Sequence, residues 1–142
     1  MRVAAIDIGT NSVLLLIAER RAQELEVVLE RAEITRLGQG VDATRRLAPE
    51  AVERTLATLS RYGAEIRAAG AAAVDAVGTS AMRDAEGGAA FVARAAEAIG
   101  VQPRVVSGAE EAALTYEGAL AGLSVTRDDA PTVFDVGGGS TE

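Results

Sequence analysis

The stretch AIDIGTNS, Ala5 to Ser12, decides the fold of this chain. Apolar residues alternate around Asp7 and then give way to small residues, which is typical of a strand that ends in a tight turn. The stretch FDVGGGSTE, Phe134 to Glu142, has the same order: apolar residues, Asp135, a run of glycines and Ser140. The repeat predicts two equivalent strand-and-turn units, one near each end of the 142 residues.

Both units carry groups that suit the binding of phosphate. An Asp near the end of a strand can hold a metal ion directly or through water, and small residues let backbone N–H groups surround an anion. Each stretch taken alone is as compatible with an ordinary hairpin turn, but the repetition favours phosphate. The expected phosphate-binding residues are Gly9, Thr10, Asn11 and Ser12 in the first turn and Gly137, Gly138, Gly139, Ser140 and Thr141 in the second.

The composition excludes several kinds of active site. The chain has no Cys and no His, and all 14 of its basic residues are Arg. These absences remove Cys and His nucleophiles, Ser-His-Asp triads, the usual zinc sites and a P-loop lysine. Any hydrolysis would therefore depend on carboxylates, hydroxyls, Arg, backbone N–H groups and a hard metal ion such as Mg²⁺.

The charge and the apolar pattern also limit the partners. A net charge of −7 argues against DNA or another nucleic acid, which would need a basic surface. The apolar runs, such as Val13–Ala18, have the length of a strand and are too short to span a membrane. Residues 1–19 lack the basic region of a signal peptide, so the default localisation is the cytoplasm.

The pattern along the chain predicts an α/β fold. Three strands follow one another, and strands and helices then alternate. This order is that of the ribonuclease-H-like lobe of the actin-like ATPase superfamily, a mixed five-stranded sheet with helices on its faces. The expected strands cover residues 2–9, 12–19, 25–37, 73–79 and 104–106, and the expected helices cover 49–70, 88–99 and 107–122.

We expect residues 1–123 to form this first lobe. The polar stretch over residues 124–130 is the best candidate for a linker. Residues 131–142 then predict the first strand, over 132–136, and the phosphate turn of a second, similar lobe that is truncated here. In such a molecule two facing turns, one per lobe, would hold a polyphosphate between them.

Five motifs resemble the exopolyphosphatase / guanosine pentaphosphate phosphatase family. They occur in the family's order: AIDIGTNS at 5–12, RLGQGVD at 36–42, GTSAMRDA at 78–85, SGAEEAALTYEG at 107–118 and DVGGGSTE at 135–142. The resemblance implies a hydrolase that removes terminal phosphate from inorganic polyphosphate, or the 5′-phosphate of pppGpp. It also implies Mg²⁺ as the cofactor, with Mn²⁺ as a substitute.

The resemblance further implies roles for four carboxylates. Glu111 matches the catalytic glutamate that would orient or deprotonate the attacking water, and Glu142 matches a second catalytic carboxylate. Asp135 and Glu142 would hold the metal ion, and Asp7 would hold metal-bound water as the counterpart of Asp135. From the residues alone, a solvated first-turn glutamate that the helix dipole favours is the better explanation of Glu111, and only the resemblance reverses this. For Asp7, the acceptance of hydrogen bonds from turn amides is an equal alternative.

Four residues in turns or at a helix start have structural explanations as well. Ser107 and Glu110 have the S-x-x-E spacing of a capping box, in which Glu110 would reach back to the Ser107 amide. Ser80 would cap the turn after the fourth strand. The resemblance assigns Arg83 to phosphate, which a guanidinium can bind through two N–H groups, and an ion pair with Asp84 is the alternative.

Two positions depart from the family pattern. Many members have a basic residue where this chain has Leu14, and an Arg where it has Ala113. These departures keep open a non-catalytic module that binds phosphate or an alarmone. A second rival is an actin-like small-molecule kinase, which would need an adenosine pocket in the second lobe. We expect the chain to be inactive alone, because half of the phosphate-binding site would lie in a missing second lobe of the same polypeptide. The full-length protein is compatible with a homodimer.

Overall fold

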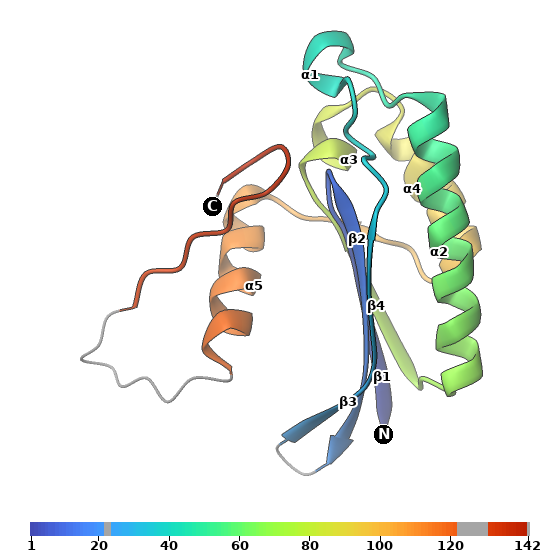
Figure 1. Ribbon diagram of the computed structural model, residues 1–142, viewed down its shortest axis with the longest axis vertical. Helices are drawn as coiled ribbons and strands as arrows, with labels where there is room; N and C mark the ends of the chain where they lie inside the picture. Colours follow the sequence, from blue (N-terminus) through green and yellow to red (C-terminus); the bar gives the residue numbers. More distant parts are fainter. Residues whose placement is uncertain (22–23, 122–130, 142) are drawn as a thin grey trace.

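The computed structural model describes residues 1–21, 24–121 and 131–141. Its centre is a five-stranded sheet in the order β3-β2-β1-β4-β5 (Figure 1). The strands are β1 (Arg2–Ile8), β2 (Ser12–Arg21), β3 (Glu24–Ile34), β4 (Ala73–Gly78) and β5 (Arg104–Val105). The helices are α1 (Val41–Thr44), α2 (Pro49–Ala69), α3 (Ser80–Asp84), α4 (Gly88–Ile99) and α5 (Gly108–Leu120).

The sheet is mixed, as the sequence predicted, and its pairing creates the edge that carries the site. β1 pairs antiparallel with β2, so Asp7 lies opposite Leu14. β1 pairs parallel with β4, so Asp7 also lies beside Val77. Because β1 and β4 run in the same direction, the residues that follow both strands meet at one edge of the sheet. The ribonuclease-H-like fold is therefore confirmed.

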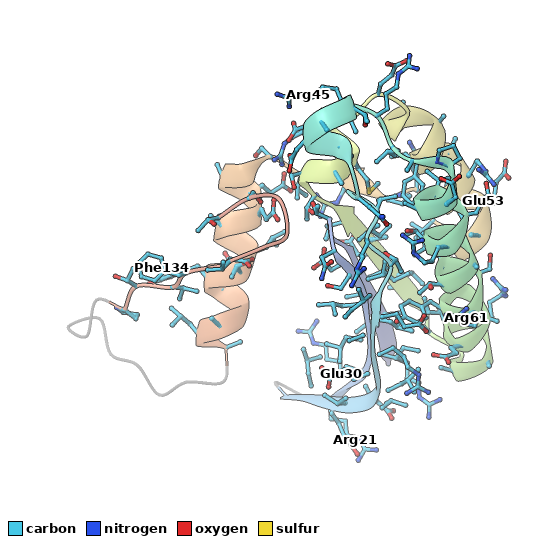
Figure 2. All side chains as sticks on the ribbon, turned by 45° about the horizontal axis from the view of Figure 1, so that its top comes forward. Arg21, Glu30, Arg45, Glu53, Arg61 and Phe134 are labelled. Atoms are coloured by element: carbon cyan, nitrogen blue, oxygen red, sulfur yellow. The ribbon has the colours of Figure 1, made fainter. Side chains whose placement is uncertain are left out.

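One face of the sheet is covered by α2 and α4 (Figure 1). Alternate residues of the strands, among them Ile6 and Leu15, point to this face and are almost completely buried. Gly63 lets the two helices cross closely, because a Cβ there would lie 2.4 Å from the Ala98 carbonyl oxygen. Glu53 lies on the outer surface of α2 (Figure 2). Its carboxylate accepts hydrogen bonds of 2.8 and 3.1 Å from the Arg94 guanidinium of α4.

The chain leaves β3 earlier than predicted. The strand ends at Ile34 because Arg36 adopts a left-handed conformation with a φ of 51°. The Thr35 and Arg36 amides then donate to the Asn11 carbonyl oxygen at 3.0 and 2.8 Å, and the Gly38 amide donates to Thr10 at 2.9 Å. This loop therefore supports the first glycine turn instead of extending the sheet.

Two short helices were not predicted. α1 has four residues and α3 has five, which is too short for an apolar period of 3.6 residues to show. The three long helices were predicted, and α2 ends as expected at Gly70, which has a φ of 66°. No helix in the described part of the chain is long and apolar enough to cross a membrane.

The last described segment lies beside α5, on the opposite side of the sheet from α2 and α4 (Figure 1). The predicted strand over 132–136 does not form: residues 131–141 contain one isolated bridge, between Val136 and Thr141. A strand needs a continuous ladder of hydrogen bonds to a neighbour, and the described residues offer this segment none. The predicted linker over 124–130 lies outside the described residues, so the division into lobes stays a prediction.

Candidate active site

The two glycine turns are closed by equivalent backbone hydrogen bonds. The Gly9 amide donates to the Ser12 carbonyl oxygen at 2.9 Å, and the Gly137 amide donates to the Ser140 carbonyl oxygen at 3.0 Å. A Cβ on Gly9 or Gly137 would lie 3.0 or 3.2 Å from that same oxygen, which explains why both turns begin with glycine. The repeat seen in the sequence is therefore a repeat in structure.

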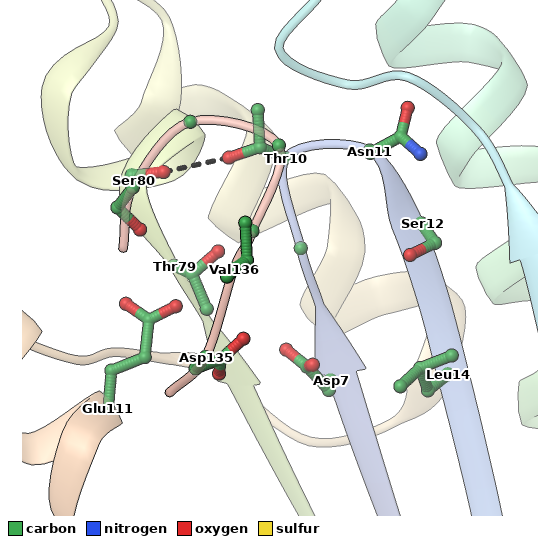
Figure 3. Close-up of a pocket in the computed structure, with 15 residues that line it drawn as sticks. Asp7, Thr10, Asn11, Ser12, Leu14, Thr79, Ser80, Glu111, Asp135 and Val136 are labelled. Atoms are coloured by element: carbon green, nitrogen blue, oxygen red, sulfur yellow. Dashed lines mark hydrogen bonds between the residues drawn. The ribbon is translucent and has the colours of Figure 1, made fainter. Parts of the chain in front are cut away.

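The two turns also face each other. A Cβ on Gly138 would lie 2.9 Å from the Asn11 Cβ, and a Cβ on Gly139 would lie 3.1 Å from Thr10 Oγ1 and 3.0 Å from Ser80 Oγ. Thr10 Oγ1 and Ser80 Oγ share a hydrogen bond of 2.8 Å (Figure 3). Ser80 does not cap the turn as predicted, because it lies inside α3 and its hydroxyl bonds to the first glycine turn instead.

A cavity of about 380 Å³ lies between the turns (Figure 3). Residues 9–12 and 136–140 supply most of its lining, so the structure brings the predicted phosphate-binding turns together. Thr141 is described but does not line the cavity. The other lining residues are Asp7, Leu14, Thr79, Ser80, Glu111 and Asp135.

Asp7 and Asp135 enter this cavity from equivalent positions, each just before its turn. Burial, and then the negative charge of Asp135, raises the pKa of the Asp7 carboxyl above its usual value of 3.8. Asp7 Oδ1 is buried and accepts no hydrogen bond within the described part of the chain. That oxygen therefore does not satisfy turn amides, which was the structural explanation for Asp7.

These carboxylates are chemically suited to a hard divalent cation. Mg²⁺ is usually bound through one or two carboxylates, with water and substrate phosphates completing its shell. The buried, unpartnered Asp7 Oδ1 beside Asp135 fits that pattern. Among the described residues, no three acidic side chains form a complete metal site, and the predicted third ligand, Glu142, lies outside them.

The two adjacent glutamates of α5 have different surroundings. The Ser107 hydroxyl accepts from the Glu110 amide at 3.2 Å, which confirms half of the predicted capping box. The Glu110 carboxylate does not return to the Ser107 amide as predicted; it accepts from Arg104 Nη1 at 2.7 Å. The Glu111 side chain is only 14% exposed and lines the cavity, so it is not a solvated surface glutamate.

Arg83 lies next to Glu111 and does not line the cavity. Its Nη1 atom is 3.7 Å from Glu111 Oε2 and donates to the Val106 carbonyl oxygen at 2.9 Å. Its Nε atom is 3.3 Å from Asp84 Oδ1, which is the ion pair that the sequence allowed. Phosphate binding by Arg83 stays a prediction and would require its guanidinium to turn toward the cavity.

Comparison with known proteins identifies the family of this chain. The model of the Ppx/GppA phosphatase family matches residues 16–142. The chain belongs to the Ppx/GppA phosphatase family. It is 46% identical to exopolyphosphatase 2 of Mycobacterium tuberculosis (strain CDC 1551 / Oshkosh), over 99% of this chain and 47% of that protein. The chain therefore spans about half the length of this curated relative.

Solved structures of the same family agree with the fold. The Ppx/GppA family member from Aquifex aeolicus is 36% identical with a TM-score of 0.85, and the match covers 99% of this chain and 45% of that one. An exopolyphosphatase from Cytophaga hutchinsonii is 26% identical with a TM-score of 0.89, again over 99% of this chain and 45% of that one.

In this member of the Ppx/GppA family, two threonines near the carboxylates were not predicted from the sequence. Thr79 lines the cavity, and Thr115 Oγ1 donates to Asp135 Oδ2 at 2.8 Å. A signal for Thr115 existed, because it follows Glu111 by four residues and so lies on the same face of α5. Leu14 lines the cavity, which places one departure from the family pattern at the site, whereas Ala113 does not.

Proposed function

We propose that this protein is a hydrolase that removes the terminal phosphate of inorganic polyphosphate. The observation that carries the proposal is the pair of facing glycine turns around a cavity that also contains Asp7, Glu111 and Asp135. Membership in the Ppx/GppA phosphatase family supports a phosphatase, and the name of the M. tuberculosis relative supports polyphosphate as its substrate.

The turns would hold the phosphate through backbone amides. Amides in tight turns form anion-binding concavities, and fixed dipoles of this kind stabilise charge that develops on phosphoryl oxygens. The described cavity lining contains three carboxylates and no basic side chain. A polyanion would therefore enter this cavity together with a cation that offsets the negative charge of the carboxylates.

We assign that role to Mg²⁺, with Mn²⁺ as a substitute. Asp7 and Asp135 would hold the ion together with Glu142. When bound, it would neutralise the terminal phosphates and the developing negative charge. The buried oxygen of Asp7 supports this assignment, because a buried carboxylate without a partner is costly unless a cation is present when the protein acts.

Glu111 would act on the attacking water. Its carboxylate would accept a proton from that water, which would then attack the terminal phosphorus in line with the leaving phosphate oxygen. Arg83 would keep the Glu111 side chain in place, since the two groups are 3.7 Å apart. The bond between the terminal phosphorus and the bridging oxygen would break, which gives orthophosphate and a chain shorter by one phosphate, and the proton on Glu111 would pass to solvent.

The finer assignments rest on the family resemblance. We propose pppGpp as a second substrate, the cytoplasm as the localisation and a homodimer for the full-length protein. A non-catalytic phosphate-binding module is the second candidate, because Leu14 lines the cavity and Arg83 does not. An actin-like kinase would replace water with a hydroxyl acceptor and would need an adenosine pocket outside this chain.

Phosphate release from polyphosphate, pppGpp and ATP tests the proposal. The assay uses the complete product of the gene, with Mg²⁺ and with EDTA. We expect Glu111→Gln to lower kcat by about 10²- to 10⁴-fold, the usual contribution of a general base. Glu110→Gln is the matched control and should leave kcat within about twofold, because Glu110 pairs with Arg104 outside the cavity.

Three outcomes would contradict parts of the proposal. Release from none of the substrates would exclude the hydrolase and favour the binding module. Phosphate transfer from ATP to a hydroxyl compound would favour the kinase. An unchanged kcat in Glu111→Gln would exclude Glu111 as the base while leaving the hydrolase in place.

A further inference from the structure

We propose that Thr115 is a positioning residue that fixes the Asp135 carboxylate relative to Glu111. The inference rests on the proposed hydrolase function. Its basis is the hydrogen bond from Thr115 Oγ1 to Asp135 Oδ2 at 2.8 Å, which joins α5 to the segment that carries the second glycine turn. The two residues are 20 positions apart in the sequence.

The direction of this hydroxyl is unusual for a threonine inside a helix. Such a hydroxyl commonly donates to the carbonyl oxygen four residues earlier. Thr55 of α2 does so, with its Oγ1 2.7 Å from the Ala51 carbonyl oxygen. Thr115 occupies the same kind of position in α5, but its hydroxyl reaches Asp135. A hydroxyl has a single proton to donate, and Thr115 directs it to the charged Asp135 carboxylate.

This bond engages Asp135 Oδ2, whereas Oδ1 accepts no hydrogen bond from the residues that the structure describes. Figure 3 shows Asp135 between Glu111 and Asp7, and all three line the cavity. Three carboxylates at close quarters repel one another, and the charge of Asp135 already acts on Asp7. A donor on Oδ2 offsets part of this repulsion and keeps the carboxylate from rotating freely.

Thr115 acts from behind the carboxylates. It does not line the main cavity, but it lines a second one of about 220 Å³. Asp7, Glu111 and Asp135 line both cavities and so stand between them. Because Thr115 lies on the far side of these groups, it would not touch the phosphate, and its effect would pass through Asp135.

Thr115 also lies on the same helix as the proposed base. Thr115 and Glu111 are four residues apart, so they project from one face of a single helix. α5 therefore carries both the proposed base and the donor that holds Asp135. Catalytic groups must be held close to their productive geometry, and a shared helix is a more rigid frame than two separate loops.

The test compares Thr115→Val with Thr115→Ser in the complete gene product. Valine has nearly the shape of threonine without the hydroxyl, whereas serine keeps the donor. We expect Thr115→Val to lower kcat for polyphosphate by about 10- to 100-fold, with KM within about twofold, as for other partners of metal-binding carboxylates. Thr115→Ser should recover kcat to within about threefold of the parent.

A calorimetric titration with Mg²⁺ alone gives a readout that does not depend on turnover. Thr115→Val should weaken Mg²⁺ binding by about tenfold, and Thr115→Ser should restore it. Thr55→Val is the control for losing a threonine hydroxyl in a helix. It should lower thermal stability, because Thr55 is fully buried, but leave kcat and Mg²⁺ affinity within about twofold.

The outcomes separate this inference from the proposed function. Parent-like kcat and Mg²⁺ affinity in Thr115→Val would overturn the positioning role while the hydrolase stands. Equal losses in the valine and serine variants, with lowered thermal stability, would overturn it in favour of a purely structural contact. If the parent protein releases no phosphate, the proposed function fails, and the Mg²⁺ titration alone decides whether Thr115 positions Asp135.

Discussion

Asp7 is a residue whose charge opposes folding. In the folded protein its pKa is raised by burial and by the negative charge of Asp135, whereas in the unfolded chain it would ionise near 3.8. A carboxyl with a raised pKa binds its proton more tightly in the folded state. Its ionisation therefore lowers stability as the pH rises from the unfolded value through the folded one, and the cost remains at neutral pH.

The substitution Asp7→Asn removes this cost. We expect the free energy of unfolding at pH 7 to rise by about 1 kcal/mol, within the usual range for relieving a functional group that destabilises the fold. The measurement is urea denaturation in EDTA. The difference should disappear at a pH well below 3.8, where both proteins carry a neutral group at this position.

Asp42→Asn, an exposed position in α1, is the control and should change stability by less than about 0.5 kcal/mol. An Asp7→Asn variant less stable than its parent at pH 7 would contradict this interpretation of the site. The same variant should lose phosphatase activity, because the cation would lose a carboxylate ligand.

At the residue scale, the sequence predicted groups with a local signal and missed those with distant partners. The glycines at 9 and 137 were predicted, because a tight turn needs them whatever lies around it. The S-x-x-E spacing of Ser107 and Glu110 predicted a structural role for Glu110, which left Glu111 as the candidate base. The link from Thr115 to Asp135 could not be predicted, because it depends on how residues 131–141 lie against α5. The contact of Arg83 with Glu111 could not be predicted either, because it depends on how α3 and α5 lie in the fold.

Among the elements, β2 shows most directly that one face of the sheet is buried and the other is partly exposed. Leu15 and Leu16 are adjacent and identical, but they point to opposite faces. Leu15 is 1% exposed and packs under α2 and α4, whereas Leu16 is 37% exposed on the other face. The two residues form a matched pair for testing which face carries the core.

We expect Leu15→Ala to lower the free energy of unfolding by about 2–5 kcal/mol, the usual cost of a cavity in a packed core. Leu16→Ala should cost less than about 1.5 kcal/mol, because its side chain is already partly in solvent. Chemical denaturation of both variants measures the difference. Equal costs would mean that the second face is as tightly packed as the first.

Elements were predictable where their pattern was long. The apolar residues of α2 recur over 21 residues and ended the predicted helix at the correct glycine. The end of β3 was missed, because it depends on two amides that bind the Asn11 carbonyl oxygen. The strand over 132–136 was predicted from its own alternation, but a strand also needs a neighbour, and alternation does not supply one.

For the whole molecule, the cavity depends on groups from well-separated parts of the chain. The first glycine turn, α3, α5 and the segment 131–141 all contribute, and Glu142 lies outside the described residues. The chain covers 47% of the length of its M. tuberculosis relative. We therefore expect the phosphate-binding site to be incomplete in the chain by itself.

The isolated chain should release phosphate at least about 100-fold more slowly than the complete gene product, the usual loss when donors to a developing oxyanion are missing. The assay uses polyphosphate with Mg²⁺. Circular dichroism and a cooperative unfolding transition should show that the isolated chain is folded. Comparable turnover by the two proteins would contradict the two-lobe model.

The parallel pairing of β1 with β4 also has a consequence for synthesis. β1, β2 and β3 are neighbours in sequence and can pair soon after they leave the ribosome. The open edge of β1 must wait for β4, whose residue Ala76 pairs with Ile6 only after 70 further residues have been added. An unpaired edge attracts other strands. The nascent chain is therefore most prone to wrong association before Gly78 emerges, and slower translation of α2 would lengthen that interval.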